Sequence, residues 1–193
     1  MKTSFKQVII KTVVLILLTS CETAKNITTP IKDFIVKPIV LPCPDYRVLA
    51  DASKIEKYKP GPGRSIIDID FYTKITGMHL TCTSKINNKT GVGLMDVDVN
   101  FDFSLRRGAA NTSGKKSFQY FISVTDLNYK IIYRETFSIN LNFKANKSSI
   151  SFSSKPITIE IPITENYSSQ DFIVFGGFEI SREQLKRNRI QKN

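Results

Sequence analysis

The sequence predicts an all-β domain, a single immunoglobulin-like antiparallel β-sandwich of seven or eight strands with a short C-terminal helix. Three observations lead to this prediction. Apolar and polar residues alternate with a period of two, short polar stretches separate the alternating segments, and a helical pattern occurs only near the end of the chain. Several short strands with turns between them are typical of such a sandwich, and a small β-barrel is the alternative.

The clearest alternation lies in residues 96–105, where five apolar side chains face one side and mostly acidic side chains face the other. The apolar positions are Val97, Val99, Phe101, Phe103 and Leu105. Similar patterns include Ile67, Ile69 and Phe71 in one segment, and Ile157, Ile159, Ile161 and Ile163 in another. One apolar face on each strand indicates half-buried strands that share a core.

Further strands and turns follow from composition. We expect strands at 78–86, 117–125, 130–143 and 171–179, with turns at 87–91, 106–116, 126–128 and 144–149. Prolines interrupt the apolar residues 34–42, so this segment suits an irregular edge strand.

A helix is expected at about residues 181–190, because Ser181 and Gln184 fit the capping box S-x-x-Q before a run of helix formers. So short a helix is not stable alone. We therefore expect Leu185 to dock on the body and the four basic side chains to stay in water. These are Arg182, Lys186, Arg187 and Arg189.

Residues 1–20 have the layout of a secretory signal peptide: lysines first, then the apolar residues 12–18 (TVVLILL), then small residues. The apolar run is too short to span a membrane, which takes about 20 residues. Residues 18–21 (LTSC) resemble a bacterial lipobox, which implies a lipid on Cys21 as the first mature residue. An ordinary signal peptide with an unrelated cysteine is the alternative. We expect a tether over residues 21–33 and the β-sandwich domain over residues 34–193.

Lipid attachment at Cys21 would leave Cys43 and Cys82, an even pair in an oxidising compartment. We expect a disulfide between them. Two buried thiols are an alternative, whereas a redox or two-cysteine metal pair has little support because no C-x-x-C occurs.

The formal net charge of +11 indicates which classes of molecule the protein could bind. The signal peptide carries three lysines and no acids, so the mature chain keeps 28 − 3 = 25 basic against 17 acidic residues, or +8. Nucleic acid is not expected as a partner of an exported protein, whereas anionic lipid or cell-wall carboxylates suit this charge. The alternative is that the charge only reflects a composition rich in lysine, asparagine and isoleucine.

No catalytic site, metal site or cofactor is expected. His79 is the single histidine and no G-x-S-x-G motif occurs, so nucleophilic catalysis lacks its usual parts. Asp96, Asp98 and Asp102 line one face of a strand without converging as calcium ligands. Residues 61–64 (GPGR) lack phosphate-loop spacing and indicate a rigid turn.

A contact loop is the one binding feature that the sequence suggests on the body. Arg106, Arg107, Lys115 and Lys116 flank the loop 108–114, which contains glycine and serine. Loops at the ends of a sandwich commonly carry binding residues. The aromatic residues beyond the loop are expected to alternate into the core instead. They are Phe118, Tyr120 and Phe121.

Two segments, residues 43–71 and 176–189, resemble a family of uncharacterised alphaproteobacterial lipoproteins. The matching features are Cys43-Pro44, residues 49–52 (LADA), residues 61–65 (GPGRS), Cys82, residues 107–110 (RGAA) and residues 177–189 (GFEISREQLKRNR). The resemblance covers essentially the whole mature domain and implies a β-rich envelope domain with a Cys43–Cys82 pair. It implies no activity. At the family's usual aspartate after the P-G-x-G-R turn, this chain has Ser65.

We therefore expect a lipid-anchored, non-enzymatic binding or structural domain of the bacterial cell envelope that faces the periplasm and contacts an envelope protein. Glu22 follows Cys21, and by analogy with enterobacterial lipoprotein sorting the lack of aspartate there favours the outer membrane. The alternative is a carrier or chaperone for an apolar ligand held in a cavity between the sheets. An enzyme would require His79 with an acidic partner, or a pair of perturbed carboxylates in a cleft.

Overall fold

The computed structural model describes residues 40–144 and 147–190. The expected signal peptide, Cys21 and the tether lie outside the described residues, as do residues 34–39 of the expected edge strand. The remaining residues of that segment, 40–42, form no strand. No helix in the described part of the chain is long and apolar enough to cross a membrane.

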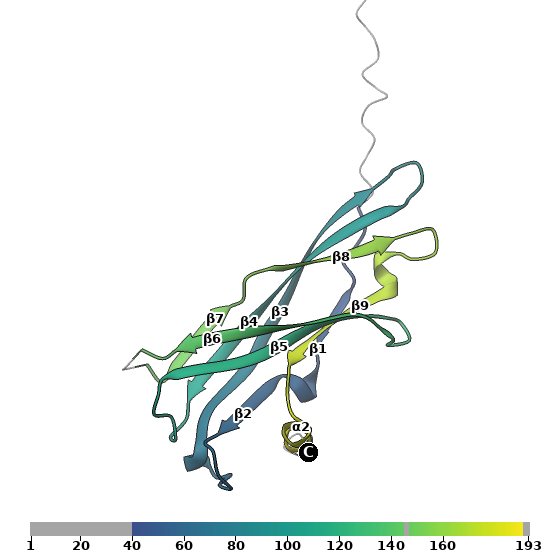
Figure 1. The fold of residues 1–193 in the computed structure, drawn as a ribbon. Helices are drawn as coiled ribbons and strands as arrows, with labels where there is room; N and C mark the ends of the chain where they lie inside the picture. The colour runs from purple at the N-terminus through teal and green to yellow at the C-terminus, as the bar shows by residue number, and fades with distance from the viewer. Residues whose placement is uncertain (1–39, 145–146, 191–193) are drawn as a thin grey trace, which may run out of the picture. The chain divides into compact units, whose positions relative to one another are not determined.

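The described residues form nine strands in two sheets (Figure 1). Sheet A has the order β1 (Asp45–Val48), β9 (Phe172–Phe178), β5 (Lys115–Asp126), β6 (Ile131–Asn142). Sheet B has the order β2 (Lys54–Tyr58), β3 (Ile69–Ile86), β4 (Gly93–Arg107), followed by β7 (Ser149–Ser153) and β8 (Ile157–Ile163) on successive parts of β4. All pairs are antiparallel except β1 with β9.

The protein is thus a β-sandwich, as predicted, and one short helix, α2 (Arg182–Ile190), lies at the C-terminus. Within residues 40–144 and 147–190, three 3₁₀ helices occur in the connections: η2 (Ala50–Ala52), η3 (Ile66–Asp68) and η4 (Ser169–Asp171). The prediction missed β1, β2 and β7, which are only four or five residues long. It also divided β3, which is one strand of 18 residues with a bulge at Ile75–Gly77.

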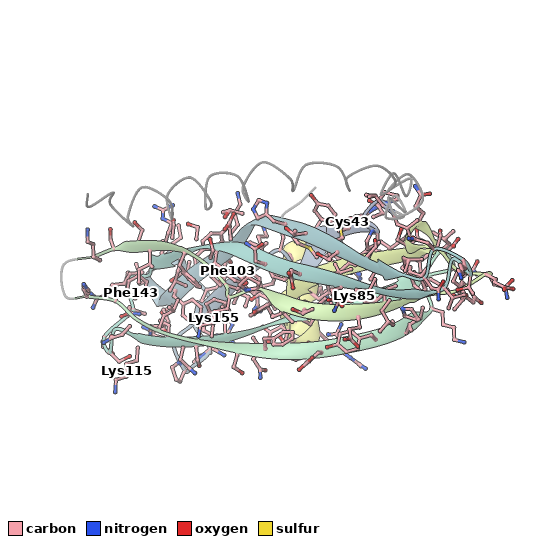
Figure 2. All side chains as sticks on the ribbon, turned by 90° about the horizontal axis from the view of Figure 1, so that it is seen from above. Cys43, Lys85, Phe103, Lys115, Phe143 and Lys155 are labelled. Carbon is pink, nitrogen blue, oxygen red and sulfur yellow. A yellow bond between two sulfur atoms is a disulfide. The ribbon has the colours of Figure 1, made fainter. Side chains whose placement is uncertain are left out.

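The core lies between the sheets and is filled by aromatic and branched side chains. The five apolar positions predicted on β4 are all fully buried. Phe103 (Figure 2) lies within 5.3 to 6.0 Å, between ring centres, of rings on both sheets: Phe101, Phe118, Tyr120, Phe152 and Phe178. Phe118, Tyr120 and Phe121 are also buried, as expected. The described side chains therefore fill the space that an apolar ligand between the sheets would need.

The prediction for Ile67 was wrong. We expected it to share the buried face of Phe71, but its side chain is 71% exposed and Asp68 is buried instead. The cause is local, because Ser65 and Asp68 bond to each other and turn the chain into η3 before β3 begins. A 3₁₀ turn breaks the period of two that the strand interpretation required.

The helix α2 begins as predicted, with the Ser181 hydroxyl accepting a hydrogen bond from the Gln184 N–H at 3.2 Å. Its docking differs from the prediction. Two polar residues, Gln184 and Asn188, are buried, whereas Leu185 is only half-buried. Of the four basic side chains expected in water, Arg187 is half-buried on the body.

Asn188 holds α2 in place. It is 2% exposed, and its side-chain amide donates hydrogen bonds to the carbonyl oxygens of Asp51 and Lys54 at 2.7 and 3.0 Å. Asn188 Oδ1 also accepts a hydrogen bond from Gln184 Nε2 at 2.7 Å. We expect Asn188→Ala to lower the free energy of unfolding by about 2 to 3 kcal/mol, since three hydrogen bonds are lost. Chemical denaturation measures this change. Lys186→Ala, at an exposed position of the same helix, should change the free energy by less than about 0.5 kcal/mol, and an equal loss in both variants would contradict the prediction.

The sandwich has two ends with different contents. We call one end the entry end, because the chain enters β1 there. The same end carries the turns 87–92, 127–130 and 164–168. The opposite end, which we call the groove end, carries the turns 59–65, 108–114 and 143–148. In Figure 2, Cys43 and Lys85 lie toward the entry end, and Lys115 and Phe143 lie toward the groove end.

Candidate binding groove

An open groove of about 810 Å³ lies at the groove end, and residues of β2 in sheet B and of the beginning of β5 in sheet A line it. Figure 1 shows the course of these two strands. Its apolar lining comes from Ile55, Phe71 and Phe118, which are core residues of the two sheets. Helix α2 and the turn 59–64 supply a charged rim. The groove therefore has a floor of largely buried apolar side chains and walls that are polar and charged.

One wall of the groove is an edge of β5. β5 pairs with β6 along its whole length but with β9 only from Tyr120 onward. β9 ends at Phe178 and the chain then leaves for α2, so among the described residues no second strand pairs with residues 115–118. We call these four residues the unpaired edge.

The direction of the backbone groups on the unpaired edge follows from the ladder. The Gln119 carbonyl accepts a hydrogen bond from the Glu179 N–H at 2.9 Å, so Gln119 faces the β9 side of β5. Because backbone groups alternate along a strand, Ser117 also directs its N–H and C=O to that side, away from β6. Ser117 is exposed and lines the groove.

Two arginines flank Tyr58 on the rim. The guanidinium carbons of Arg64 and Arg187 lie 5.4 and 5.5 Å from the centre of the Tyr58 ring. Glu183 pairs with Arg187 and lies 3.7 Å from Arg64 Nε. Arg187 Nε is buried and has no acceptor among the described residues. The rim therefore presents guanidinium groups that are held in place by cation–π contacts and one carboxylate.

Residues 61–64, for which a rigid turn was predicted, lie in the connection from β2 to η3, and Arg64 bonds to the backbone of this connection. Arg64 donates hydrogen bonds to the carbonyl oxygens of Gly61 and Gly63 at 2.8 and 2.7 Å. Gly61 has a φ of +123°, and a Cβ on Gly63 would lie only 2.5 Å from the Asp68 carboxylate. Hydrogen bonds from Ser65, together with Lys59, lower the pKa of Asp68 to about 2.

This pKa predicts an acid-sensitive turn. A carboxyl group whose folded pKa lies below its unfolded value of 3.8 stabilises the fold above that value, and the contribution is lost as the pH falls toward about 2. We expect Asp68→Asn to lower the free energy of unfolding near neutral pH, and the difference from the wild type to shrink between about pH 4 and pH 2. Denaturation across this range measures it. A difference that stays constant with pH would contradict the role given to the charge.

Of the four basic residues of the expected contact loop, two are buried or half-buried and two are exposed. Lys116 is buried, and its ammonium contacts both carboxylate oxygens of Asp70 at 2.8 Å. Arg107 is half-buried and donates to the Asn111 carbonyl at 3.2 Å. Arg106 and Lys115 are exposed. The structure therefore leaves two of the four residues available to a partner, because the other two hold the loop to the body.

The motifs on which the family resemblance rests meet around α2 and the groove. Asn188 and Arg189 of the C-terminal motif contact the segment 49–52 through Asp51. Glu183 of the same motif lies beside Arg64 of the turn 61–65. The groove itself was missed by the sequence analysis. The only sequence signals near it were the rigid turn and the capping box. Neither indicates that β9 stops opposite Tyr120 and leaves the first residues of β5 without a partner on that side among the described residues.

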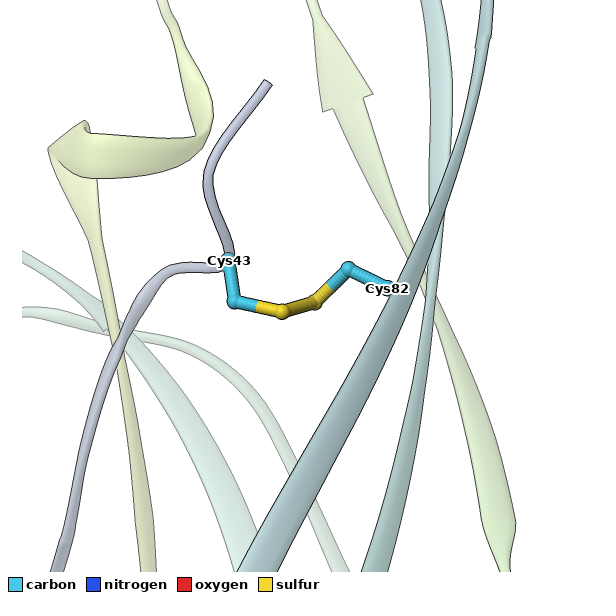
Figure 3. The surroundings of a disulfide bond; sticks show 2 residues. All are labelled: Cys43 and Cys82. Atoms are coloured by element: carbon cyan, nitrogen blue, oxygen red, sulfur yellow. A yellow bond between two sulfur atoms is a disulfide. The ribbon is translucent and has the colours of Figure 1, made fainter. Parts of the chain in front are cut away.

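Cys43 and Cys82 form a disulfide, as expected (Figure 3). It joins the segment before β1 to β3, a strand of the other sheet. The bond therefore fixes the point at which the chain enters the sandwich.

His79 does have an acidic partner, which the sequence did not reveal. His79 Nε2 lies 2.8 Å from Asp102 Oδ2, and the Ser153 hydroxyl donates to Asp102 Oδ1 at 2.5 Å. These hydrogen bonds lower the pKa of Asp102. The order differs from that of a catalytic triad, because the carboxylate and not the histidine contacts the serine. The cluster is exposed and does not line the groove.

The other aspartates of β4 have separate partners. Asp96 pairs with Lys85 at 2.6 Å, and Asp98 accepts a hydrogen bond from Thr158 at 2.6 Å. In the part of the chain that the structure describes, no group of three His, Cys, Asp or Glu side chains lies close enough to hold a metal ion.

Comparisons with known proteins add little. No protein-family model and no curated protein matches the chain. Among solved structures, the chain is similar to the variable domain of the AgI/II polypeptide BspA of Streptococcus agalactiae, with 13% sequence identity over 70% of this chain and 78% of that chain. The TM-score is 0.15, and so weak a likeness carries no argument about function.

Proposed function

We propose that this chain is a lipid-anchored, non-catalytic binding domain of the bacterial cell envelope. Cys21 carries the lipid and the sandwich faces the periplasm, at the outer membrane in preference to the inner one. Its groove takes an extended peptide segment of an envelope protein. The observation that carries the proposal is the unpaired edge of β5 inside the groove.

An extended peptide fits the chemistry of this site. A free strand edge offers backbone donors and acceptors in the spacing that an added strand needs, and neighbouring pockets select its side chains. Ser117 supplies the backbone groups, and Phe118 and Ile55 supply an apolar surface. The rim arginines Arg64 and Arg187 suit a peptide that carries a carboxylate or exposed carbonyl groups.

The same geometry favours a peptide over an apolar ligand. The space between the sheets is packed, so a carrier function would have to use the groove, whose rim is charged. An enzymatic function draws no support from His79, because its pair with Asp102 is exposed outside the groove.

The anchor is tested by Cys21→Ala in the producing bacterium. We expect the variant to leave the membrane fraction and appear in the soluble fraction, while the wild type sediments with membranes. Metabolic labelling with a tagged fatty acid should mark the wild type alone. Unchanged sedimentation together with unchanged labelling would defeat the proposed anchor.

The groove is tested by Ser117→Pro. Proline removes the N–H that the unpaired edge offers and leaves the hydrogen bonds to β6 intact, so we expect peptide binding to fall about tenfold or more. Ser117→Ala, which keeps the N–H, is the matched control and should bind normally. An envelope protein is first identified by crosslinking to the groove, and the binding of peptides tiled over its sequence then measures both variants. Equal binding by the two would show that β5 does not pair with the peptide.

A further inference from the structure

The exposed apolar side chains of the described residues are concentrated at the entry end. The most compact group lies in the β5–β6 hairpin, which we call the hairpin tip (residues 127–132). Its four large apolar side chains are more than half exposed: Leu127 56%, Tyr129 63%, Ile131 58% and Ile132 55%. Single exposed apolar residues are ordinary on protein surfaces, but four in six residues mark a contact surface.

The hairpin tip is built to hold these side chains outward. Asp126 Oδ1 accepts hydrogen bonds from the N–H groups of Asn128 and Lys130, both at 2.9 Å. Tyr129 has a φ of +63°, in the left-handed region where glycine or asparagine is favoured. A tyrosine occupies the position instead; the residue is 63% exposed, and the centre of its ring lies 6.2 Å from that of Phe175.

The hairpin tip lies at the end where the chain enters the domain. Asp45, the first residue of β1, is opposite Ile173 of β9, and Ile173 is opposite Thr125, just before the hairpin tip. The disulfide fixes Cys43 to β3 at this same end. From Cys21 to Cys43 the chain advances 43 − 21 = 22 residues, which span at most about 80 Å in any conformation. A lipid on Cys21 would therefore hold the entry end within about 80 Å of the membrane.

We infer that the hairpin tip inserts into the headgroup region of the membrane that carries the anchor. The inference rests on the proposed lipid anchor at Cys21. Tyr129 suits this depth, because its ring is apolar and its hydroxyl reaches water or headgroups. Lys130 faces lipid phosphates, whereas the charge of Arg47 nearby is balanced by Asp45 at 2.6 Å. Apolar burial therefore supplies most of the attraction, and the contact keeps the groove end directed away from the bilayer.

Tryptophan fluorescence tests the inference, since the chain contains no tryptophan. The lipid-anchored chain is purified from membranes and reconstituted in phospholipid vesicles with one fifth anionic lipid, with or without brominated acyl chains. In Ile131→Trp, we expect the brominated lipid to reduce the emission about threefold. Ile67→Trp is the matched control, because Ile67 is 71% exposed at the groove end, and its emission should not change.

A second variant separates insertion from simple proximity. The second substitution, Tyr129→Asn, is added to Ile131→Trp. Asparagine tolerates the left-handed backbone conformation at position 129, so the fold is kept. The substitution also removes an apolar ring, so quenching should fall by about half. Absence of quenching in Ile131→Trp would overturn the inference, and so would equal quenching in Ile131→Trp and Ile67→Trp. Flotation of the same vesicles reports the anchor separately. A protein that floats but is not quenched keeps its proposed anchor and loses this inference, which would leave the hairpin tip as a surface for a protein.

Discussion

Replacement of both Cys43 and Cys82 by alanine is expected to lower the free energy of unfolding by about 4 kcal/mol. The two cysteines are 39 residues apart, and a cross-link over a loop of this length restricts the unfolded chain by about that amount. The loss is a large share of the stability of a typical domain and should lower the melting temperature by about 10 °C.

The reduced wild type is the natural control for this prediction. A reducing agent should shift the urea midpoint of the wild type toward that of the double variant and leave the double variant unchanged. A wild type whose midpoint does not respond to reduction would contradict a stabilising role of the bond. The loss matters for the proposed function as well, because the bond fixes where the anchor segment joins the sandwich.

The second large effect is expected from Phe103→Ala. Phe103 is 1% exposed and contacts aromatic rings of both sheets, so its removal leaves a cavity at the centre of the core. Such truncations cost about 4 kcal/mol, since the lost burial and the cavity both contribute. Calorimetry or chemical denaturation measures the change.

Ile66→Ala is the control, because Ile66 is 81% exposed. It should change the free energy of unfolding by less than about 0.5 kcal/mol. A small effect of Phe103→Ala, within the range of the control, would mean that the sheets do not pack through this residue.

The sequence predicted the elements whose signal is local. The alternation of β4 and of β8 translated directly into buried faces, and the capping box at Ser181 placed the beginning of α2. The even number of cysteines that remain after Cys21 likewise predicted the disulfide. Each of these predictions depends on residues near one another in the chain or on a simple count.

One error came from a local turn, and the others arose where residues far apart in the sequence determine the structure. Ile67 has the period of a strand, but the bonds between Ser65 and Asp68 turn the chain first. Lys116 looks like an exposed basic residue until Asp70, 46 residues away, is placed beside it. The groove exists because β9 stops opposite Tyr120 and does not reach the beginning of β5. The register of two strands cannot be predicted from either strand alone.

The proposals give the two ends of the sandwich different tasks. The disulfide, the incoming chain and the hairpin tip lie at the entry end, and the unpaired edge of β5 lies at the groove end. A domain arranged in this way would hold the membrane with one end and present a strand edge to a partner with the other.

Photo-crosslinking in living cells tests the central claim, that the groove binds an extended segment of an envelope protein. A photoreactive amino acid replaces Gln119 in the groove of the lipid-anchored chain, and Thr81 on the exposed outer face of sheet B serves as the control position. We expect one dominant adduct from position 119, none from position 81, and a crosslinked site within a single short segment of the partner. Ser117→Pro should abolish the adduct. Adducts of equal yield at both positions, or an adduct that survives Ser117→Pro, would contradict the claim.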